Sequence, residues 1–318
     1  VSYLSFFFLA LLRVTAGRVG KRYAVVHVCN MPDFLVFAAV LAKPLGTKVL
    51  LDIHDSMPQL FLVKFGGRKE DFRYKLVVLQ ERLSAAFADM VMTVHEPFKN
   101  DILARDGLDP RKITVVANFP DGEVFRPVED YRPGLPLQLI YHGTIAPRFG
   151  FETVLDALAR IQVPGKVRIK IVGEGEYANR LKTLIRERGL GGIVDFDAHA
   201  VGVKLLPDML KRYHLGMVCY APSAATDYML PVKLLELLAM GIPSITVPNK
   251  ALRHYLDESL YFAYDPADAG SLAALLNRLV REPGLIEEKR KVLLRERGRF
   301  LWEGEKRKYV DLLNSLSG

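Results

Sequence analysis

The sequence predicts an α/β protein of two Rossmann-like domains, whose parallel sheets face each other across a cleft. Short, continuous apolar runs alternate with segments of helical periodicity along most of the chain. This alternation is typical of buried parallel strands that are covered by helices on both faces. Four prolines within residues 118–136 interrupt it and indicate a linker between two such units.

The expected elements follow from these patterns in chain order. Residues 72–88, for example, carry apolar side chains at positions 72, 76, 79, 83, 86 and 87, the spacing of one helix face. In the first domain we expect strands at 23–29, 48–53, 90–94 and 112–116, and helices at 32–42, 72–88 and 97–105. In the second we expect strands at 137–141, 167–172, 193–196, 215–220 and 244–247, and helices at 150–160, 177–188, 203–212 and 231–240. Further helices are expected at 268–281, 285–299 and 302–316.

Composition narrows the classes of function. A chain of 318 residues, 50% hydrophobic and 25% charged, is long enough for two globular domains. Cys29 and Cys219 are far apart in sequence, which indicates a reducing compartment and shows no metal-site spacing. The net charge of +8 favours acidic partners such as nucleotide phosphates or anionic lipid. No basic, aromatic-interleaved module is apparent, so nucleic acid is not an expected partner.

The N-terminal residues form a distinctive apolar segment with a basic flank. Residues 3–12 are almost entirely apolar and are followed by Arg13, Arg18, Lys21 and Arg22. Ten residues are too few to span a bilayer, which needs about 20. We expect a buried core helix here, and the alternative is an interfacial helix against anionic lipid.

Residues 226–247 are predicted to form the main ligand site. Pro231 suits the first turn of a helix, which Gly241 then ends. A helix start carries unpaired N–H groups and a partial positive charge, and is a natural seat for phosphate. Lys233 would add a cation there, and Glu236 could accept hydrogen bonds from hydroxyl groups. The alternative is a buried helix with one local Lys233–Glu236 ion pair.

Three strand ends supply further candidates. Gly143 lets the backbone approach a ligand, and Arg148 can bind a phosphate, although an ordinary loop with an exposed arginine is the alternative. Gly173 and Glu174 form a tight turn after the next strand. In the first domain, His54 and Asp55 follow a buried strand, where an imidazole beside a carboxylate could polarise a hydroxyl. Their alternative roles are a capping aspartate and a structural histidine.

Two other polar strand ends are assigned structural roles. We expect His95 and Asn118 to cap helices and form turns. Trp302, near the start of the last helix, is expected to be a packing residue.

The order Leu-Pro-Val-Lys-Leu-Leu-Glu-Leu-Leu-Ala-Met-Gly-Ile-Pro at 230–243 resembles the donor-binding helix of GT-B glycosyltransferases, specifically glycosyltransferase family 4 (group 1). The resemblance implies that Glu236 holds ribose or sugar hydroxyls and that the helix start faces a diphosphate. Many members carry an earlier glutamate as well, and here Tyr228, beside Asp227, occupies that position. The family also implies that the terminal helix crosses back over the first domain.

The resemblance extends to both domains. Typical members have an arginine directly after the glycine corresponding to Gly143 and a lysine before the second glycine; Thr144 and Phe149 stand there, so Arg148 would supply the charge for the diphosphate. Gly173 and Glu174 match a turn beside the nucleotide base and ribose. Cys29 replaces the second histidine of a His-x-His segment that starts at His27.

The implied activity is a metal-independent transfer, with retention of configuration, of a hexosyl group from a nucleoside diphosphate sugar. The acceptor would be a hydroxyl of a saccharide or lipid-linked saccharide in glycan or polysaccharide biosynthesis. Catalysis is assigned to His54, Asp55 and Glu236. Donor binding is assigned to Gly143, Arg148, Gly173, Glu174, Tyr228, Leu230, Pro231, Lys233 and Glu236. No cofactor or metal is expected.

The remaining expectations concern organisation and alternatives. We expect domains at 1–122, 123–300 and a returning helix at 301–318, with the first domain lacking an initial strand–helix–strand–helix unit of the family. A cytoplasmic location at the inner membrane face is expected. The alternatives are a nucleotide-sugar-binding protein without turnover and a sugar-nucleotide epimerase. A dinucleotide-dependent dehydrogenase is disfavoured because no Gly-x-Gly-x-x-Gly turn occurs.

Overall fold

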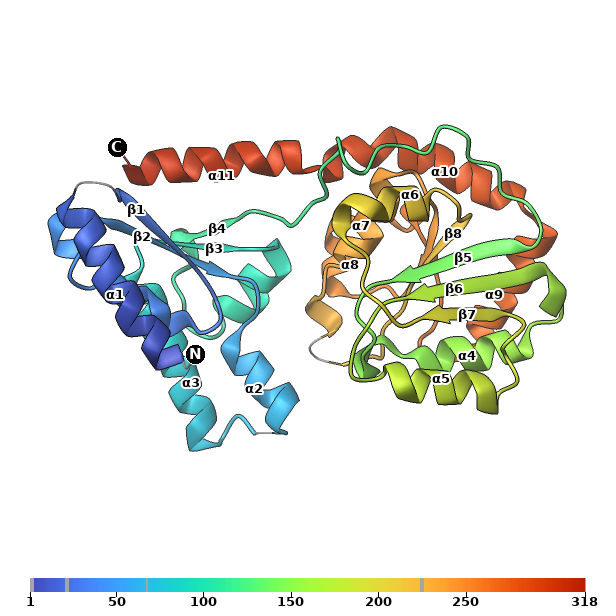
Figure 1. The fold of residues 1–318 in the computed structure, drawn as a ribbon, viewed down its shortest axis with the longest axis horizontal. Helices are drawn as coiled ribbons and strands as arrows, with labels where there is room; N and C mark the ends of the chain where they lie inside the picture. Colours follow the sequence, from blue (N-terminus) through green and yellow to red (C-terminus); the bar gives the residue numbers. More distant parts are fainter. Residues whose placement is uncertain (1–2, 21–22, 67, 224–225, 318) are drawn as a thin grey trace. The chain divides into compact units, whose positions relative to one another are not determined.

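The computed structural model describes residues 3–20, 23–66, 68–223 and 226–317. The chain divides into two compact units. The first unit consists of Val1–Asn118 together with Glu305–Gly318, and the second unit of Phe119–Gly304. Each contains a parallel sheet with flanking helices, so the predicted α/β class with two parallel sheets is confirmed (Figure 1).

The sheet of the first unit has the order β1-β2-β3-β4, with every neighbouring pair parallel. Its strands are β1 (Val25–Cys29), β2 (Lys48–Ile53), β3 (Met90–Thr93) and β4 (Ile113–Val115). The helical segments of this unit are α1 (Tyr3–Val19), η1 (Asp33–Ala39), η2 (Lys43–Leu45), α2 (Met57–Phe65), α3 (Phe72–Phe87), η3 (Phe98–Leu103) and η4 (Pro110–Lys112). The final helix, α11 (Trp302–Ser317), belongs to this unit from Glu305 onward. The register pairs Cys29 with Asp52, at adjoining strand ends.

Two helical expectations for the first unit need correction, and one helix was missed. Residues 32–42 form the 3₁₀ segment η1 rather than one α-helix, and residues 98–103 form a π-helix. Helix α2 was not expected at all. It begins after Ser56, whose hydroxyl accepts a hydrogen bond from the Gln59 N–H, and Pro58 lies in its first turn, where no N–H is needed.

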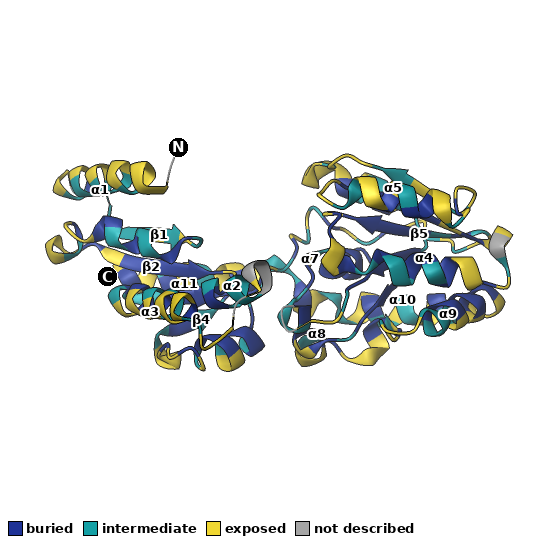
Figure 2. Ribbon diagram, turned by 90° about the horizontal axis from the view of Figure 1, so that it is seen from below, coloured by how far each residue is buried: buried dark blue, intermediate teal, exposed yellow. Residues whose placement is uncertain are grey.

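Helix α1 contradicts the prediction of a buried core helix. Tyr3, Phe8 and Leu12 are 65%, 60% and 68% exposed, and Gly17 is the residue of α1 that is buried. The helix packs on η1, for example through the rings of Phe7 and Phe34. Its apolar residues surround the whole helix, so one face alone can meet the unit and the others stay exposed (Figure 2). Within the described ranges, no helix is both long and apolar enough to cross a bilayer.

The second unit contains a larger parallel sheet with the order β10-β9-β8-β5-β6-β7. Its strands are β5 (Leu137–His142), β6 (Val167–Val172), β7 (Val194–Asp197), β8 (Leu215–Val218), β9 (Ser244–Thr246) and β10 (Phe262–Ala263). Its α-helices are α4 (Phe151–Arg160), α5 (Ala178–Glu187), α6 (Leu206–Leu210), α7 (Val232–Ala239), α8 (Lys250–Tyr255), α9 (Ala269–Arg281) and α10 (Gly284–Glu296). Its 3₁₀ segments are η5 (Pro147–Phe149), η6 (Pro164–Lys166), η7 (Val203–Leu205), η8 (Thr226–Tyr228), η9 (Glu258–Leu260) and η10 (Arg297–Phe300). The central strand β5 is fully buried at Leu139 and Ile140.

Helix α7 ends as the sequence predicts. Gly241 has φ +67°, and its N–H donates to Leu238 O while the Ile242 N–H donates to Leu237 O. This pair of bonds satisfies the last carbonyls of the helix. A Cβ on Gly241 would lie 2.7 Å from Cδ2 of Leu294, so that side chain would have to shift. At the other end, Pro231 is extended, with φ −77° and ψ 112°, and precedes the first helical residue instead of occupying it.

Candidate active site

Two glycine turns meet at the carboxyl ends of β5 and β6 in the second unit. The strand register pairs His142 with Val172, which sets Gly143 beside Gly173. A Cβ on Gly173 would lie 1.7 Å from the carbonyl oxygen of Gly143, so no other residue fits without moving the turn. The Ile145 N–H donates to Glu174 O over 2.9 Å and joins the two loops.

A hollow of about 220 Å³ opens beside these turns. Its walls come from the ends of β5 and β6, from the segment before α6 and from the first residue of α6. The lining residues are His142, Gly143, Thr144, Val172, Gly173, Glu174, Ala200, Val201 and Leu206. The structure therefore brings together three of the predicted donor-binding residues, Gly143, Gly173 and Glu174, in one concave site. Small residues and exposed backbone at such a site suit the close approach of a flat, polar ligand.

Two cations lie around the Phe149 ring at the same end of β5. Lys233 Nζ is 4.4 Å from the ring centroid of Phe149 and 4.2 Å from that of Tyr141, and it donates to Tyr141 Oη over 2.9 Å. The Arg148 guanidinium is 4.9 Å from the Phe149 centroid. Lys233 Nζ is also 3.2 Å from the position that a Cβ of Gly143 would occupy. The ammonium thus faces the glycine turn.

The charge of these cations is not balanced locally. No carboxylate oxygen lies within 4 Å of Lys233 Nζ or of the Arg148 guanidinium in the described part of the chain, so the predicted alternative of a Lys233–Glu236 ion pair is wrong. Burial between the two rings, with a smaller contribution from Arg148, lowers the pKa of Lys233 to about 8, although Cys219 and Glu236 act in the opposite direction. Two cations beside one ring, neither with an ion-pair partner among the described residues, suit the binding of an anion.

Glu236 is held by a residue that the sequence analysis did not select, His142. His142 Nε2 and Glu236 Oε2 are 2.8 Å apart, and the two residues are 5% and 9% exposed. His142 Nδ1 is buried and finds no hydrogen-bond partner among the described residues. One oxygen of Glu236 therefore remains for a ligand, in an orientation set by the imidazole. The sequence feature that could have identified His142 is its position directly before Gly143, at the end of β5.

The other predicted donor residues lie before α7. Tyr228 ends η8, and its hydroxyl lies 3.1 Å from Lys250 Nζ. Leu230 packs against the core of the second unit. The carbonyl of Pro231 accepts the N–H of Leu234, which starts α7, and no side chain caps this helix start. The N–H groups ahead of Leu234 are thus the ones that could bind an anion, and this role stays a prediction.

In the first unit, Asp52 organises a cluster of polar side chains. Its Oδ2 lies 3.0 Å from Nε2 of His54 and 3.3 Å from Nε2 of His27. Burial alone would raise the pKa of Asp52, but the hydrogen bonds from the two imidazoles outweigh burial and lower it. The same hydrogen bond raises the pKa of His54. The side chains of His27, Cys29 and Asp52 share one face of the sheet because side chains alternate along β1 and β2, and His54 follows directly after β2.

The carboxylate that contacts His54 is therefore Asp52, not its neighbour Asp55. Asp55 is exposed, and its carbonyl accepts from the Asn30 amide over 2.5 Å while the Asn30 Oδ1 accepts the His54 N–H. Asn118 does not cap a helix as expected; its amide nitrogen lies 3.2 Å from Nδ1 of His54. Since the amide donates to Nδ1, the proton of the neutral ring is on Nε2, facing Asp52.

Two further expectations concern structural roles around this cluster. His95 caps the π-helix as predicted, because its Nδ1 accepts the N–H of Phe98 over 3.1 Å. Helix α11 contacts the cluster through Tyr309, whose hydroxyl lies 3.0 Å from Nδ1 of His27. Glu305 fixes the same helix by accepting the buried N–H of Ala117 over 2.8 Å. Helix α11 is thus part of the site as well as of the packing.

Comparison with known proteins follows the division into two halves. Residues 3–118 match the family model described as a glycosyl transferase 4-like domain, and residues 136–282 match the model of glycosyl transferases group 1. Among curated relatives, the chain is 25% identical over 179 residues to the putative colanic acid biosynthesis glycosyltransferase WcaL of Salmonella typhimurium, covering 55% of this chain and 44% of that protein. It is 21% identical over 234 residues to the chitobiosyldiphosphodolichol beta-mannosyltransferase of Candida albicans, covering 69% and 50%. The chain thus spans about half the length of these relatives.

Solved structures show the same fold. Anabaena Alr3699/HepE in complex with UDP superposes with a TM-score of 0.73 at 15% identity, covering 96% of this chain and 82% of that one. The sucrose-phosphate synthase of Thermosynechococcus elongatus superposes with a TM-score of 0.70 at 20% identity, covering 99% and 80%. At such identities the likeness concerns the fold alone.

Proposed function

Because the chain belongs to the group 1 glycosyltransferases of the GT-B fold, we propose that it transfers a hexosyl group from a nucleoside diphosphate sugar to an acceptor hydroxyl. The transfer retains the anomeric configuration and needs no metal ion. The acceptor is a saccharide or lipid-linked saccharide in glycan or polysaccharide biosynthesis. The observation that carries this proposal is the pair of unbalanced cations, Lys233 and Arg148, beside the glycine turn of Gly143.

The second unit supplies what a nucleotide sugar requires. The diphosphate carries negative charge that Lys233 and Arg148 match, together with the uncapped start of α7. The hollow beside Gly173 and Glu174 accommodates the base and ribose. Glu236, oriented by His142, accepts hydrogen bonds from ribose or sugar hydroxyls. As the glycosidic bond breaks, charge grows on the diphosphate, and the same cations stabilise the leaving group without a metal ion.

The first unit supplies the group proposed to address the reacting sugar. His54 is 41% exposed at its side chain, while Asp52 behind it is 6% exposed. Asp52 and Asn118 fix the imidazole from both nitrogens, so the ring is pre-oriented before a substrate arrives. Asp55 is assigned to the same reaction as an exposed carboxylate next to His54. In this proposal Asp52 is a positioning residue that acts through His54.

The exposed helix α1 supports an acceptor at a membrane surface, on the cytoplasmic face. Leu4, Leu9 and Leu12 are each exposed by more than half, and Arg13 lies directly after them. Apolar side chains beside cations are the pattern of a helix that lies in the headgroup region of an anionic bilayer. A lipid-linked acceptor would be presented at the same surface.

The test is a ligand panel of UDP, GDP, ADP and their sugars, without metal, read as a shift in melting temperature. Wild type is compared with Glu236→Gln, which keeps the shape of the side chain and removes its charge. One nucleotide series should raise the melting temperature of wild type, and the shift from the sugar nucleotide should be smaller in Glu236→Gln. No shift with any nucleotide would contradict donor binding.

Turnover separates this proposal from its alternatives. With the base identified, release of free nucleoside diphosphate is followed with and without saccharide and lipid-linked acceptors. A transferase gives a glycosylated acceptor. An epimerase would alter the sugar without any acceptor, and a binding protein would leave the donor intact with every acceptor tested.

A further inference from the structure

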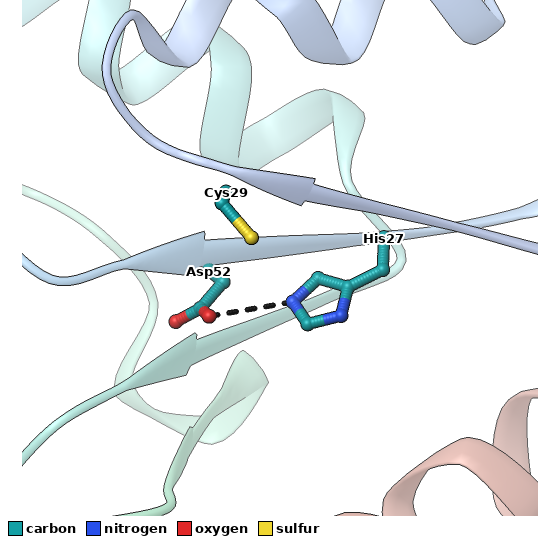
Figure 3. A group of neighbouring side chains, drawn as sticks. All are labelled: His27, Cys29 and Asp52. Carbon is teal, nitrogen blue, oxygen red and sulfur yellow. Dashed lines mark hydrogen bonds and ion pairs between the residues drawn. The ribbon is translucent and has the colours of Figure 1, made fainter. Parts of the chain in front are cut away.

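We propose that His27, Cys29 and Asp52 bind a divalent transition-metal ion, with Zn²⁺ as the best chemical match. The three residues offer one nitrogen, one sulfur and one carboxylate oxygen, and these atoms all lie within 4.8 Å of one another (Figure 3). Sulfur and imidazole ligands select zinc and its neighbours over Mg²⁺ or Ca²⁺, which prefer oxygen.

The strand pairing brings these ligands together. Cys29 is the register partner of Asp52, and His27 lies two residues earlier on the same face of β1. Zinc bonds to nitrogen, oxygen and sulfur are about 2.0–2.3 Å long, which places tetrahedral ligands about 3.3–3.7 Å apart. The ligands must therefore approach by about 1 Å on binding. Cys29 is exposed and can make this movement by rotating its side chain.

A second observation points to a cation independently. Asp52 is 4% exposed, and its Oδ1 is buried without a hydrogen-bond partner among the described residues. Buried carboxylate oxygens are normally satisfied, because leaving one without a partner costs free energy. A metal ion beside Cys29 Sγ and His27 Nε2 would satisfy this oxygen. The carboxylate would then bind the ion with Oδ1 and keep Oδ2 for His54.

His27 and His54 differ in the partner of Nδ1, and this difference decides which of them can bind the metal ion through Nε2. Nε2 of His27 faces Asp52 Oδ2 over 3.3 Å and donates to it while no metal is bound. Tyr309 Oη lies 3.0 Å from Nδ1 and can accept a proton there, so on metal binding the ring proton can move from Nε2 to Nδ1 and Nε2 becomes the ligand. Such a partner on the second nitrogen is usual for histidines that bind metals. His54 has the opposite arrangement, because the Asn118 amide donates to its Nδ1 and leaves the proton on Nε2. The chain thus supplies three ligands, and water completes the coordination.

Binding is a substitution of a proton by the metal ion. The Cys29 thiol loses its proton to solvent as the sulfur–metal bond forms, and no redox change is involved. The ion would share Asp52 with His54, so occupancy should weaken the hydrogen bond that orients His54. If the proposed transfer reaction is correct, Zn²⁺ then inhibits it. The metal site itself does not depend on that reaction.

The test uses untagged protein and Co²⁺, a spectroscopic substitute for zinc. Wild type should bind one equivalent and show the near-ultraviolet band of a thiolate–cobalt bond, which Zn²⁺ removes and Mg²⁺ does not. Cys29→Ser should lose the band, whereas Cys219→Ala, a buried cysteine of the second unit, should keep it. Tyr309→Phe should bind Co²⁺ about 10-fold more weakly, as expected for an outer partner of a ligand.

Two outcomes would overturn the proposal. One is wild type that shows no thiolate–cobalt band, and the other is a band that survives in Cys29→Ser. Melting curves of each variant show whether a lost band reflects unfolding. His27→Gln gives a second route, since it leaves the thiol in place and should still weaken Co²⁺ binding by at least about 10-fold.

Discussion

Replacement of Lys233 by methionine tests whether the ammonium group of Lys233 binds the diphosphate. Methionine preserves much of the apolar stem between Tyr141 and Phe149 and removes the ammonium. A hydrogen bond to a charged group contributes about 1.5–3 kcal/mol, so the variant should bind the nucleoside diphosphate about 10- to 150-fold more weakly. Lys291→Met, on an exposed position of α10, removes one charge elsewhere and should leave the affinity unchanged.

The pH dependence sharpens this prediction. With a pKa of about 8, Lys233 is mostly charged at pH 7 and mostly neutral at pH 9. Only the charged form pairs with the diphosphate, and the bound diphosphate keeps the lysine protonated. Affinity of wild type should therefore fall about tenfold between pH 7 and pH 9.

Isothermal titration calorimetry across this range provides the measurement. The nucleotide base titrates in the same way with wild type and with Lys233→Met. The difference between the two slopes of affinity against pH therefore gives the contribution of Lys233 alone. The affinity of Lys233→Met should not show the tenfold fall between pH 7 and pH 9. Equal slopes, or equal affinities at pH 7, would refute the assignment of Lys233 to the diphosphate.

Three other predictions follow from the described contacts. Gly173→Ala should weaken nucleotide binding at least about tenfold because its Cβ would lie 1.7 Å from a carbonyl oxygen, whereas Gly191→Ala, with no atom within 4 Å, should bind normally in the same titration. The pKa of the buried Glu81 is raised to about 8 by burial and by nearby acids, so its folded state holds a proton that the unfolded state loses from pH 4.5 upward. The free energy of unfolding should therefore fall by up to about 5 kcal/mol between pH 4.5 and pH 8. Denaturant titrations of Glu81→Gln should show a smaller fall. An equal fall in the variant would contradict the assignment of this pH dependence to Glu81. Serine at both Leu9 and Leu12 should reduce co-sedimentation with anionic vesicles, while serine at the similarly exposed Val203 and Leu205 should not; equal binding of the two double variants would exclude α1 as the contact.

Much of the candidate site in the second unit was predictable because its signals are local in sequence. Lys233 and Glu236 stand out as the charges of an otherwise apolar helix, and Gly143 and Gly173 directly follow buried strands. Periodicity places such residues at the carboxyl ends of parallel strands, where this class of sheet binds ligands. The partners of these residues were not predictable in the same way. His142 meets Glu236 across 94 residues of sequence, and no local pattern links them.

The sequence by itself determined the α/β class, every strand except β10, and the helix that carries Lys233 and Glu236, because apolar periodicity and glycine placement act over short distances. Tertiary structure alone decided which carboxylate meets His54. Asp52 and Asp55 both lie within two residues of it, and the folded chain brings Asp52 Oδ2 to 3.0 Å from Nε2 of His54. Burial of α1 was likewise decided by packing. An apolar helix is covered only where a neighbour reaches it, and here most of its surface stays exposed.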